Sequence, residues 1–241
     1  ITLKYTFPEG TEDGRLWIAF YRSNRQGTVW LDHVSATDHT LPPEDRVVLT
    51  RVGRESRYLV ARAEQAALQY PDAGEEMQRI RSWHEGLAER VHCDDPDVVT
   101  ESGEIFAAVG RDHASINRLG GTGPLLATWS TPCERITPDA PVPAVLQQEC
   151  RTVALRDEYV AVGIQLFNTC REDTAAVIRL TGSNGLRPPI VRRQAFMETW
   201  YKKAATRLSD PLPLVPGNAG HYDLVLAPGA IEKLFILSFV E

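Results

Sequence analysis

Alternating apolar and polar positions predict β-strands at both ends of the chain. Residues 1–36 contain strand-like runs that are separated by turns rich in Pro, Gly, Asp and Asn. Residues 129–241 contain further runs of the same kind, spaced as in a β-sandwich. The run Lys233–Val240 is apolar at both parities, so we expect both of its faces to be covered.

The apolar period changes to that of a helix within residues 55–92. Apolar residues recur at helical spacing on both sides of a break at Pro71–Gly74, which predicts a hairpin of two amphipathic helices. Residues 37–54 are a polar connector with one short apolar run, and residues 93–128 show no clear period. The expected fold is therefore mainly β, with antiparallel β-sandwiches and a helical hairpin insertion. Its segments are strands in 1–54, the hairpin in 55–92, a connector in 93–128 and a β-sandwich in 129–241.

Strand alternation also predicts the core of the last segment. In Tyr159–Phe167 the even-numbered positions share one apolar face, and Gln165 lies on the other. We therefore expect Ile164→Ala to destabilise the fold strongly and Gln165→Ala to cost less than ~1 kcal/mol. The predicted core consists of Val153, Leu155, Val162, Ile164, Leu166, Val177, Ile178 or Leu180, Leu224, Leu226, Leu234 and Ile236.

Composition and charge exclude several classes of protein. The 241 residues are 43% hydrophobic and 24% charged, which is ordinary for a globular chain that buries a core. The formal net charge is -6 and no run of basic residues exceeds two, which disfavours nucleic-acid binding and a polybasic membrane anchor. No stretch approaches the ~20 apolar residues of a membrane span. The first and last residues lie in strand-like runs, so we expect a piece of a longer polypeptide.

The cysteines carry no metal-binding signature. Cys93, Cys133, Cys150 and Cys170 form no CxxC pair and no cluster with histidine, which argues against a zinc site. Two interpretations stay open, namely buried thiols, or one or two disulfides in a secreted protein.

Motifs for catalysis are also missing from the sequence. The GGTG turn at Gly120–Gly123 lacks the Lys-Ser/Thr of a phosphate-binding loop, and no GxSxG or HExxH occurs. Adjacent carboxylates on a strand point to opposite faces, so a pair such as Asp94–Asp95 favours surface charge over a glycosidase site. No catalytic or metal residue is assigned. A structural Ca²⁺ held by Asp32 or by Asp94–Asp95 is the one cofactor that the pattern leaves open.

Aromatic residues in the first strands form the strongest candidate site. Trp17 and Tyr21 share a strand parity opposite to that of the apolar residues beside them. Their rings suit the C–H faces of sugars, and polar neighbours suit the hydroxyls, although the pattern favours a core position for each Trp somewhat over a ligand-binding one. The candidate carbohydrate-binding residues are Trp17, Tyr21, Arg22, Asn24, Trp30 and Asp32.

Several segments resemble parts of known carbohydrate-active families. The run GTVWLDHVSA (Gly27–Ala36) resembles the final strand of galactose-binding-like jelly rolls in carbohydrate-binding modules. Four later segments resemble, in order and spacing, the β-sandwich that precedes the catalytic barrel of uncharacterised glycoside-hydrolase-like proteins. They are TWSTPCERITPDAPVP, VALRDEYVAVGIQLFNT, RLSDPLPLV and LVLAPGAIEKLFIL, in which Phe235 stands where that family usually has Trp.

This resemblance implies an accessory segment of a glycoside-hydrolase-like protein. Residues 1–54 would be jelly-roll-like strands of a carbohydrate-binding module, and residues 129–241 an accessory β-sandwich domain. The segment would bind polysaccharide or oligosaccharide, or brace a downstream catalytic domain of the same polypeptide, in a secreted or periplasmic protein. Two alternatives remain, a glycan hydrolase or lyase that uses paired carboxylates, and a structural or protein-interaction module.

Overall fold

A computed structural model describes residues 41–134, 136–181, 186–194, 196–201, 204–209, 214–218 and 220–241. The strands expected before residue 41 lie outside these ranges. Within residues 41–134 the chain forms helices α1 (Pro43–Gln69), α2 (Gly74–His92), α3 (Pro96–Thr100) and α4 (Ser102–Arg118), with the short 3-10 helix η1 (Pro71–Ala73) between the first two.

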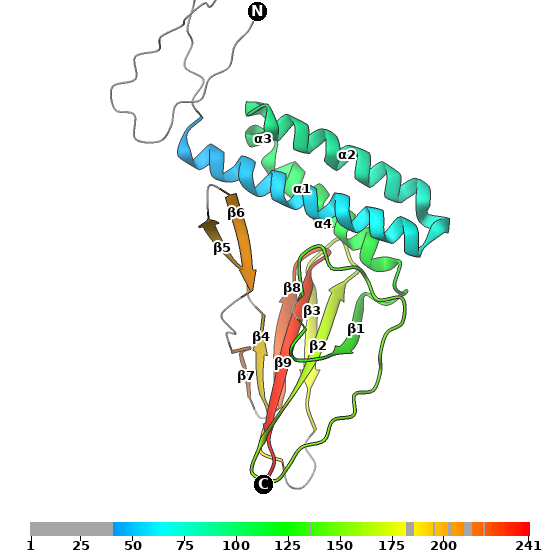
Figure 1. Ribbon diagram of the computed structural model, residues 1–241, viewed down its shortest axis with the longest axis vertical. Helices are drawn as coiled ribbons and strands as arrows, with labels where there is room; N and C mark the ends of the chain where they lie inside the picture. The colour runs from blue at the N-terminus through cyan, green and yellow to red at the C-terminus, as the bar shows by residue number, and fades with distance from the viewer. Residues whose placement is uncertain are drawn as a thin grey trace, which may run out of the picture. The chain divides into compact units, whose positions relative to one another are not determined.

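The first two helices form the expected hairpin. α1 begins with Pro43 at its first position and with Glu44 and Asp45 in its first turn, and both features favour a helix N-terminus. α1 ends at Gln69, just before Pro71, and α2 runs back alongside it (Figure 1). The break predicted at Pro71–Gly74 coincides with η1, so the prediction of two joined helices is confirmed.

The described residues are not mainly β, and that part of the prediction is wrong. α1 begins at Pro43, so residues 43–54 belong to a helix and not to the strand segment 1–54. The expected connector 93–128 contains α3, α4 and the start of the sheet. Gly103 and Gly110 lower the helix propensity of α4, and polar residues at its buried positions interrupt the apolar pattern.

The rest of the described chain forms antiparallel sheets. The largest has the order β1-β2-β9-β4, a second has the order β3-β8-β7, and β5 pairs with β6. The strands are β1 (Leu125–Ser130), β2 (Tyr159–Asn168), β3 (Thr174–Arg179), β4 (Ile190–Arg193), β5 (Phe196–Tyr201), β6 (Ala204–Ser209), β7 (Gly217–Asn218), β8 (His221–Leu226) and β9 (Ile231–Phe239).

Two apolar clusters form the core. One lies among the helices and includes Leu126 and Phe167 from the largest sheet, so it joins helices and sheet. The other contains side chains from the two larger sheets, such as Leu166 and Leu234 from one and Leu224 and Leu226 from the other. Burying this much apolar surface is the main driving force for folding.

The core prediction for residues 129–241 is confirmed where the strand pattern is regular. Leu166, Leu224, Leu226, Leu234 and Ile236 are buried, and Val162, Ile164, Ile178 and Leu180 pack against them. Val153 and Leu155 are 92% and 65% exposed, because residues 150–155 form no strand. Val177 is 52% exposed, because its neighbours Ala176 and Ile178 occupy the inward face of β3. These three assignments were wrong.

The turn between β8 and β9 contacts helix α4 closely. Gly229 adopts a positive φ of 64° in this turn, a conformation that glycine tolerates best. A Cβ atom at this position would lie 2.4 Å from the Cβ of His113 and 2.6 Å from the carbonyl oxygen of Gly110. Glycine is therefore required both for the turn and for the approach of the sheet to α4.

Candidate functional site

The six residues proposed from sequence to bind carbohydrate all lie outside the described residues. Trp17, Tyr21, Arg22, Asn24, Trp30 and Asp32 belong to the range 1–40, so their arrangement stays a prediction. The site can therefore be built only from residues 41–241. The polar features of that part include two buried clusters, a buried lysine and one surface hollow.

The first buried cluster joins α1, α2 and α4 through a serine, a histidine and an aspartate. Nδ1 of His84 lies 3.4 Å from Oγ of Ser56, and Nε2 of His84 lies 3.1 Å from a carboxylate oxygen of Asp112. Arg79 donates to the other carboxylate oxygen of Asp112 at 3.5 Å. His84 and Ser56 are fully buried, so this hydroxyl cannot meet a substrate. The cluster satisfies buried polar groups between helices and is not a hydrolytic site.

The second buried cluster surrounds the guanidinium of Arg62 in α1. It donates to Oδ1 of Asn117 at 2.6 Å and to the backbone carbonyl of Ala140 at 3.1 Å. It also lies 2.7 Å from Nδ1 of His113, which must accept the bond because arginine can only donate. Burial lowers the pKa of Arg62 to about 9, and the charge of Asp139 opposes this effect.

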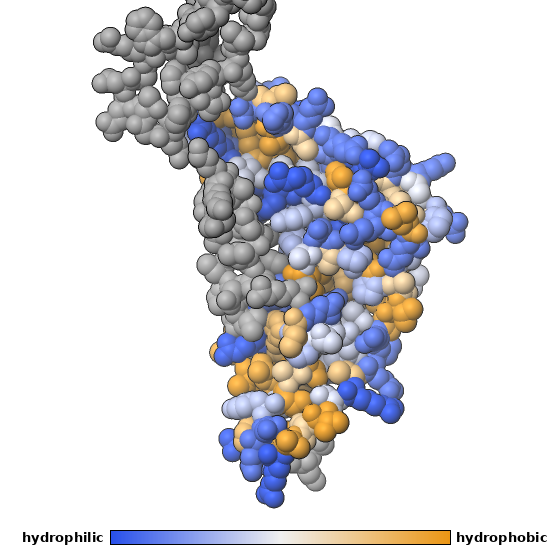
Figure 2. Space-filling model, in the orientation of Figure 1, coloured by the Kyte–Doolittle hydropathy of each residue, from blue (hydrophilic) through white to orange (hydrophobic). Residues whose placement is uncertain are grey.

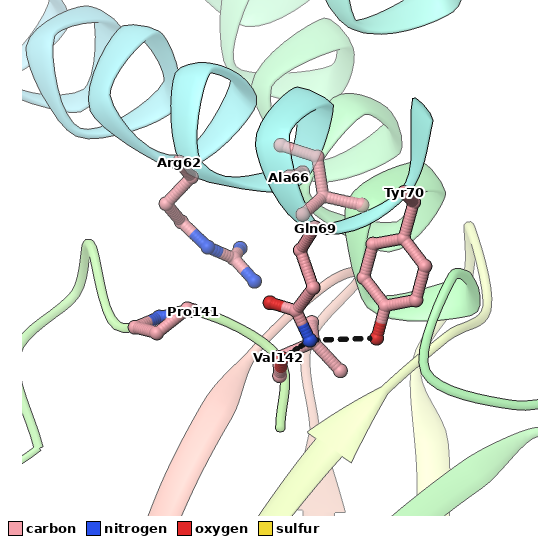
Figure 3. Close-up of a pocket in the computed structure, with 7 residues that line it drawn as sticks. Arg62, Ala66, Gln69, Tyr70, Pro141 and Val142 are labelled. Atoms are coloured by element: carbon pink, nitrogen blue, oxygen red, sulfur yellow. Dashed lines mark hydrogen bonds between the residues drawn. The ribbon is translucent and has the colours of Figure 1, made fainter. Parts of the chain in front are cut away.

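Arg62 and the nearby Gln69 fasten α1 to the loop that follows β1. Figure 3 shows both side chains extending from α1 toward Pro141 and Val142. Gln69 donates to the carbonyl of Val142 at 3.0 Å and to the hydroxyl of Tyr70 at 3.1 Å. The space among these groups is too small to admit a water molecule, so it serves packing and not ligand binding.

Asn168, at the end of β2, organises the sheet beside this cluster. Its Nδ2 donates to the carbonyls of Leu226, Ala227 and Glu172 at 2.8–3.0 Å. Its Oδ1 accepts from the backbone N–H of Cys170 and from the hydroxyl of Thr174. One buried amide thus fixes the ends of β2 and β8 and the start of β3.

An open hollow of about 230 Å³ lies beside the edge strand β1. Trp129, Thr131, Gln147, Arg151, Thr152 and Ala161 are among the residues that line it. Its lining contains no carboxylate, and Arg151 is its one charged side chain. Trp129 lies in the segment TWSTPCERITPDAPVP and is not among the residues that the sequence predicts to bind carbohydrate.

A buried lysine anchors the loop after β1 to the outer face of β9. Lys233 is 1% exposed, and its Nζ donates to the backbone carbonyls of Thr131, at 2.8 Å, and of Glu134. Burial lowers the pKa of Lys233, while the charge of Glu134 opposes this effect. The absence of a side chain at Gly163 leaves room for Lys233, since a Cβ there would lie 3.2 Å from its Cε.

The adjacent acidic residues do not assemble a metal site. Asp95 accepts from the backbone N–H of Asp97 at the start of α3 and from the guanidinium of Arg90 at 2.7 Å, and these bonds lower its pKa. No group of three or more metal-ligating side chains occurs among the residues that the structure describes. Of the two cysteine interpretations, free thiols hold for Cys133, Cys150 and Cys170, but the first two are exposed and not buried.

Comparisons with known proteins identify no relative. No protein family matches the chain, and no curated protein or solved structure is similar to it at a significant level. In the described ranges, no helix is both long and apolar enough to cross a membrane. The function must therefore be argued from the residues themselves.

Proposed function

We propose that the chain is a non-catalytic accessory module of a secreted or periplasmic glycoside-hydrolase-like protein. In this proposal the sheets of the module form a β-sandwich, and the module binds polysaccharide. The second apolar cluster, which includes Leu166, Leu224 and Leu234, supports the sandwich, since its side chains come from the two larger sheets. Inward faces that interdigitate in this way are typical of sandwiches.

The absence of acids from the surface hollow carries the non-catalytic part of the proposal. A glycosidase needs two carboxylates about 5–10 Å apart across its substrate. Neither is present in the lining of the hollow beside β1. The other hydrolase-like arrangement, Ser56–His84–Asp112, is sealed between helices. Binding is therefore better supported than hydrolysis.

An exposed apolar group supports a second role, in which the module braces a neighbouring domain. Tyr159 is exposed at the start of β2 and stacks edge-on against Phe239, and Ile190, which pairs with Leu237 on the same face of the sheet, is exposed as well. Apolar surface is visible at this end of the sheet in Figure 2. Contiguous apolar patches on a soluble protein often mark contacts with another protein surface.

Native affinity electrophoresis tests the proposal. The purified chain is run through gels that contain xylan, mixed-linkage glucan, galactomannan or polygalacturonate, beside a non-binding reference protein. Retardation by at least one glycan, with no release of reducing ends from it, is the expected result. If no glycan retards the chain, carbohydrate binding fails and bracing is left; release of reducing ends would instead establish the hydrolase alternative.

A further inference from the structure

The hollow beside β1 exists because two paired strands differ in length. β1 ends at Ser130, which pairs with Gly163, whereas β2 continues to Tyr159. On this side of β2, no described strand pairs with residues 159–162. The opening at the end of β1 is left between this edge and residues 150–152 of the following loop.

The loop that forms the other wall is fixed to β1 by three hydrogen bonds. The backbone N–H of Trp129 donates to the carbonyl of Gln147 at 3.1 Å, and the N–H of Gln147 donates to Oγ1 of Thr128 at 2.8 Å. The indole Nε1 of Trp129 donates to the carbonyl of Gln148 at 3.0 Å. The ring and the loop are therefore held in place before any ligand arrives, which limits the entropy lost on binding.

The side chains around Trp129 combine the two kinds of contact that a sugar requires. Trp129 is partly exposed: part of its side chain packs against the core between the sheets, and the rest of the indole lines the hollow, where it offers an apolar surface to the C–H face of a pyranose. Gln147 and Arg151 are exposed and line the same hollow; the guanidinium of Arg151 lies 3.5 Å from the exposed carboxylate of Glu149, a solvent-screened pair that leaves further N–H groups, beside the amide of Gln147, for hydroxyl groups. The volume is smaller than the ~300–1,000 Å³ of drug-sized pockets, which suits one sugar ring.

We infer that this hollow binds a pyranose unit of a polysaccharide, with the ring of Trp129 as the stacking platform and with Gln147 and Arg151 as hydrogen-bond donors. The inference rests on the proposed function, and it draws the binding site from residues 129–162, a part of the sequence that does not include the candidate residues of the first strands.

Substitutions on the two sides of the hollow test this site in the same affinity gels. Trp129→Ala removes the platform, and the double variant Gln147→Ala/Arg151→Ala removes the polar groups from exposed positions where the fold is not at risk. Trp83→Ala is the matched control, because Trp83 is a second partly exposed tryptophan but lies on α2. Circular dichroism and thermal unfolding confirm that each variant is folded.

We expect the dissociation constant for the retarding glycan to rise about tenfold or more in Trp129→Ala and in the double variant, and to stay unchanged in Trp83→Ala. If Trp129→Ala and the double variant are both retarded as strongly as the wild type, the inference is overturned. The proposed function would still stand, and Trp17 and Trp30 would be the next residues to replace. A wild-type chain that no glycan retards would overturn both. Because the double variant alters exposed side chains only, a folding defect in Trp129→Ala does not remove the test.

Discussion

Asn117 in α4 and Asn168 at the end of β2 are joined by a buried hydrogen bond of 2.7 Å, from the amide of the first to the backbone carbonyl of the second. The same amide nitrogen of Asn117 donates to the carbonyl of Gly229 at 3.0 Å, and its oxygen accepts from Arg62 at 2.6 Å. Asn117 therefore links α1, α4, β2 and the turn before β9. This contact, and not apolar packing alone, sets how the helices meet the sheet.

Replacing Asn117 should destabilise the fold sharply. Asn117→Ala leaves the carbonyls of Asn168 and Gly229 and one N–H of Arg62 without these partners inside the protein. Each orphaned buried group costs about 1–3 kcal/mol, so we expect a loss of about 3 kcal/mol or more in chemical denaturation. Gln78→Ala is the control, since Gln78 is an exposed amide on α2 and bonds only to exposed Ser82 among the described contacts. Equal effects of the two variants would contradict the role of Asn117.

Arg62 should not tolerate replacement by lysine. Its planar fork reaches Asn117, His113 and the carbonyl of Ala140 together, and a lysine ammonium cannot copy that geometry. We expect both Arg62→Lys and Arg62→Met to lower the free energy of unfolding by about 2–3 kcal/mol. Arg57→Met, at an exposed position of the same helix, should change it by less than about 0.5 kcal/mol. Full rescue by lysine would show that charge and not geometry is what the site needs.

The regular parts of the fold were predictable from sequence because periodicity reports burial directly. β8 alternates strictly between exposed and buried positions, β2 carries apolar residues at alternate positions of its sequence, β9 carries a nearly continuous apolar run, and the helical hairpin follows a clean helical period. α4 was missed because its buried face includes Asp112, His113 and Asn117, which read as surface residues until their partners are known. Val153 was misassigned because a short apolar run does not reveal whether a neighbouring strand is there to pair with it.

The candidate site was harder to predict because it depends on a difference in strand length. The end of β1 at Ser130 and the return of the loop at Gln147 are long-range features that no local pattern records. A tryptophan followed by Ser-Thr-Pro was the available signal, since it marks an aromatic side chain at the point where a strand stops.

The two faces of β2 give a third prediction, which revises the expectation for Gln165. Gln165 is only 9% exposed, whereas Ile164 is half-buried against the core between the sheets, so both alanine variants should destabilise the fold. Phe167 and Tyr159 make the sharper pair, because they share one face of β2 but differ in burial. Phe167→Ala should cost about 3–5 kcal/mol in thermal or urea unfolding, and Tyr159→Ala less than about 1 kcal/mol. Similar losses of unfolding free energy in the two variants would mean that the helices do not cover the end of the sheet that contains Phe167.

Lys233 gives a prediction about pH. Burial lowers the pKa of Lys233 in the folded protein below the ordinary 10.5 of the unfolded chain. Between the folded and the unfolded pKa, the unfolded chain therefore binds more protons than the folded chain. Stability rises with pH wherever the unfolded state binds more protons, and the wild type should therefore gain stability as the pH rises toward 10.5.

Urea denaturation of wild type and Lys233→Met across this range isolates the effect. The methionine variant loses the bonds to the carbonyls of Thr131 and Glu134 and should be less stable by about 1–3 kcal/mol at neutral pH. The difference in unfolding free energy between the two proteins should widen as the pH approaches 10.5. Only in the wild type does deprotonation of Lys233 remove the unfavourable free energy of a buried charge. The other lysines, Lys4, Lys202 and Lys203, are present in both proteins, so their titration cancels in the comparison. The opposite result would be a difference in unfolding free energy that narrows as the pH rises. It would show that the folded protein stabilises the Lys233 ammonium better than water does, contrary to the expectation for a side chain that is only 1% exposed.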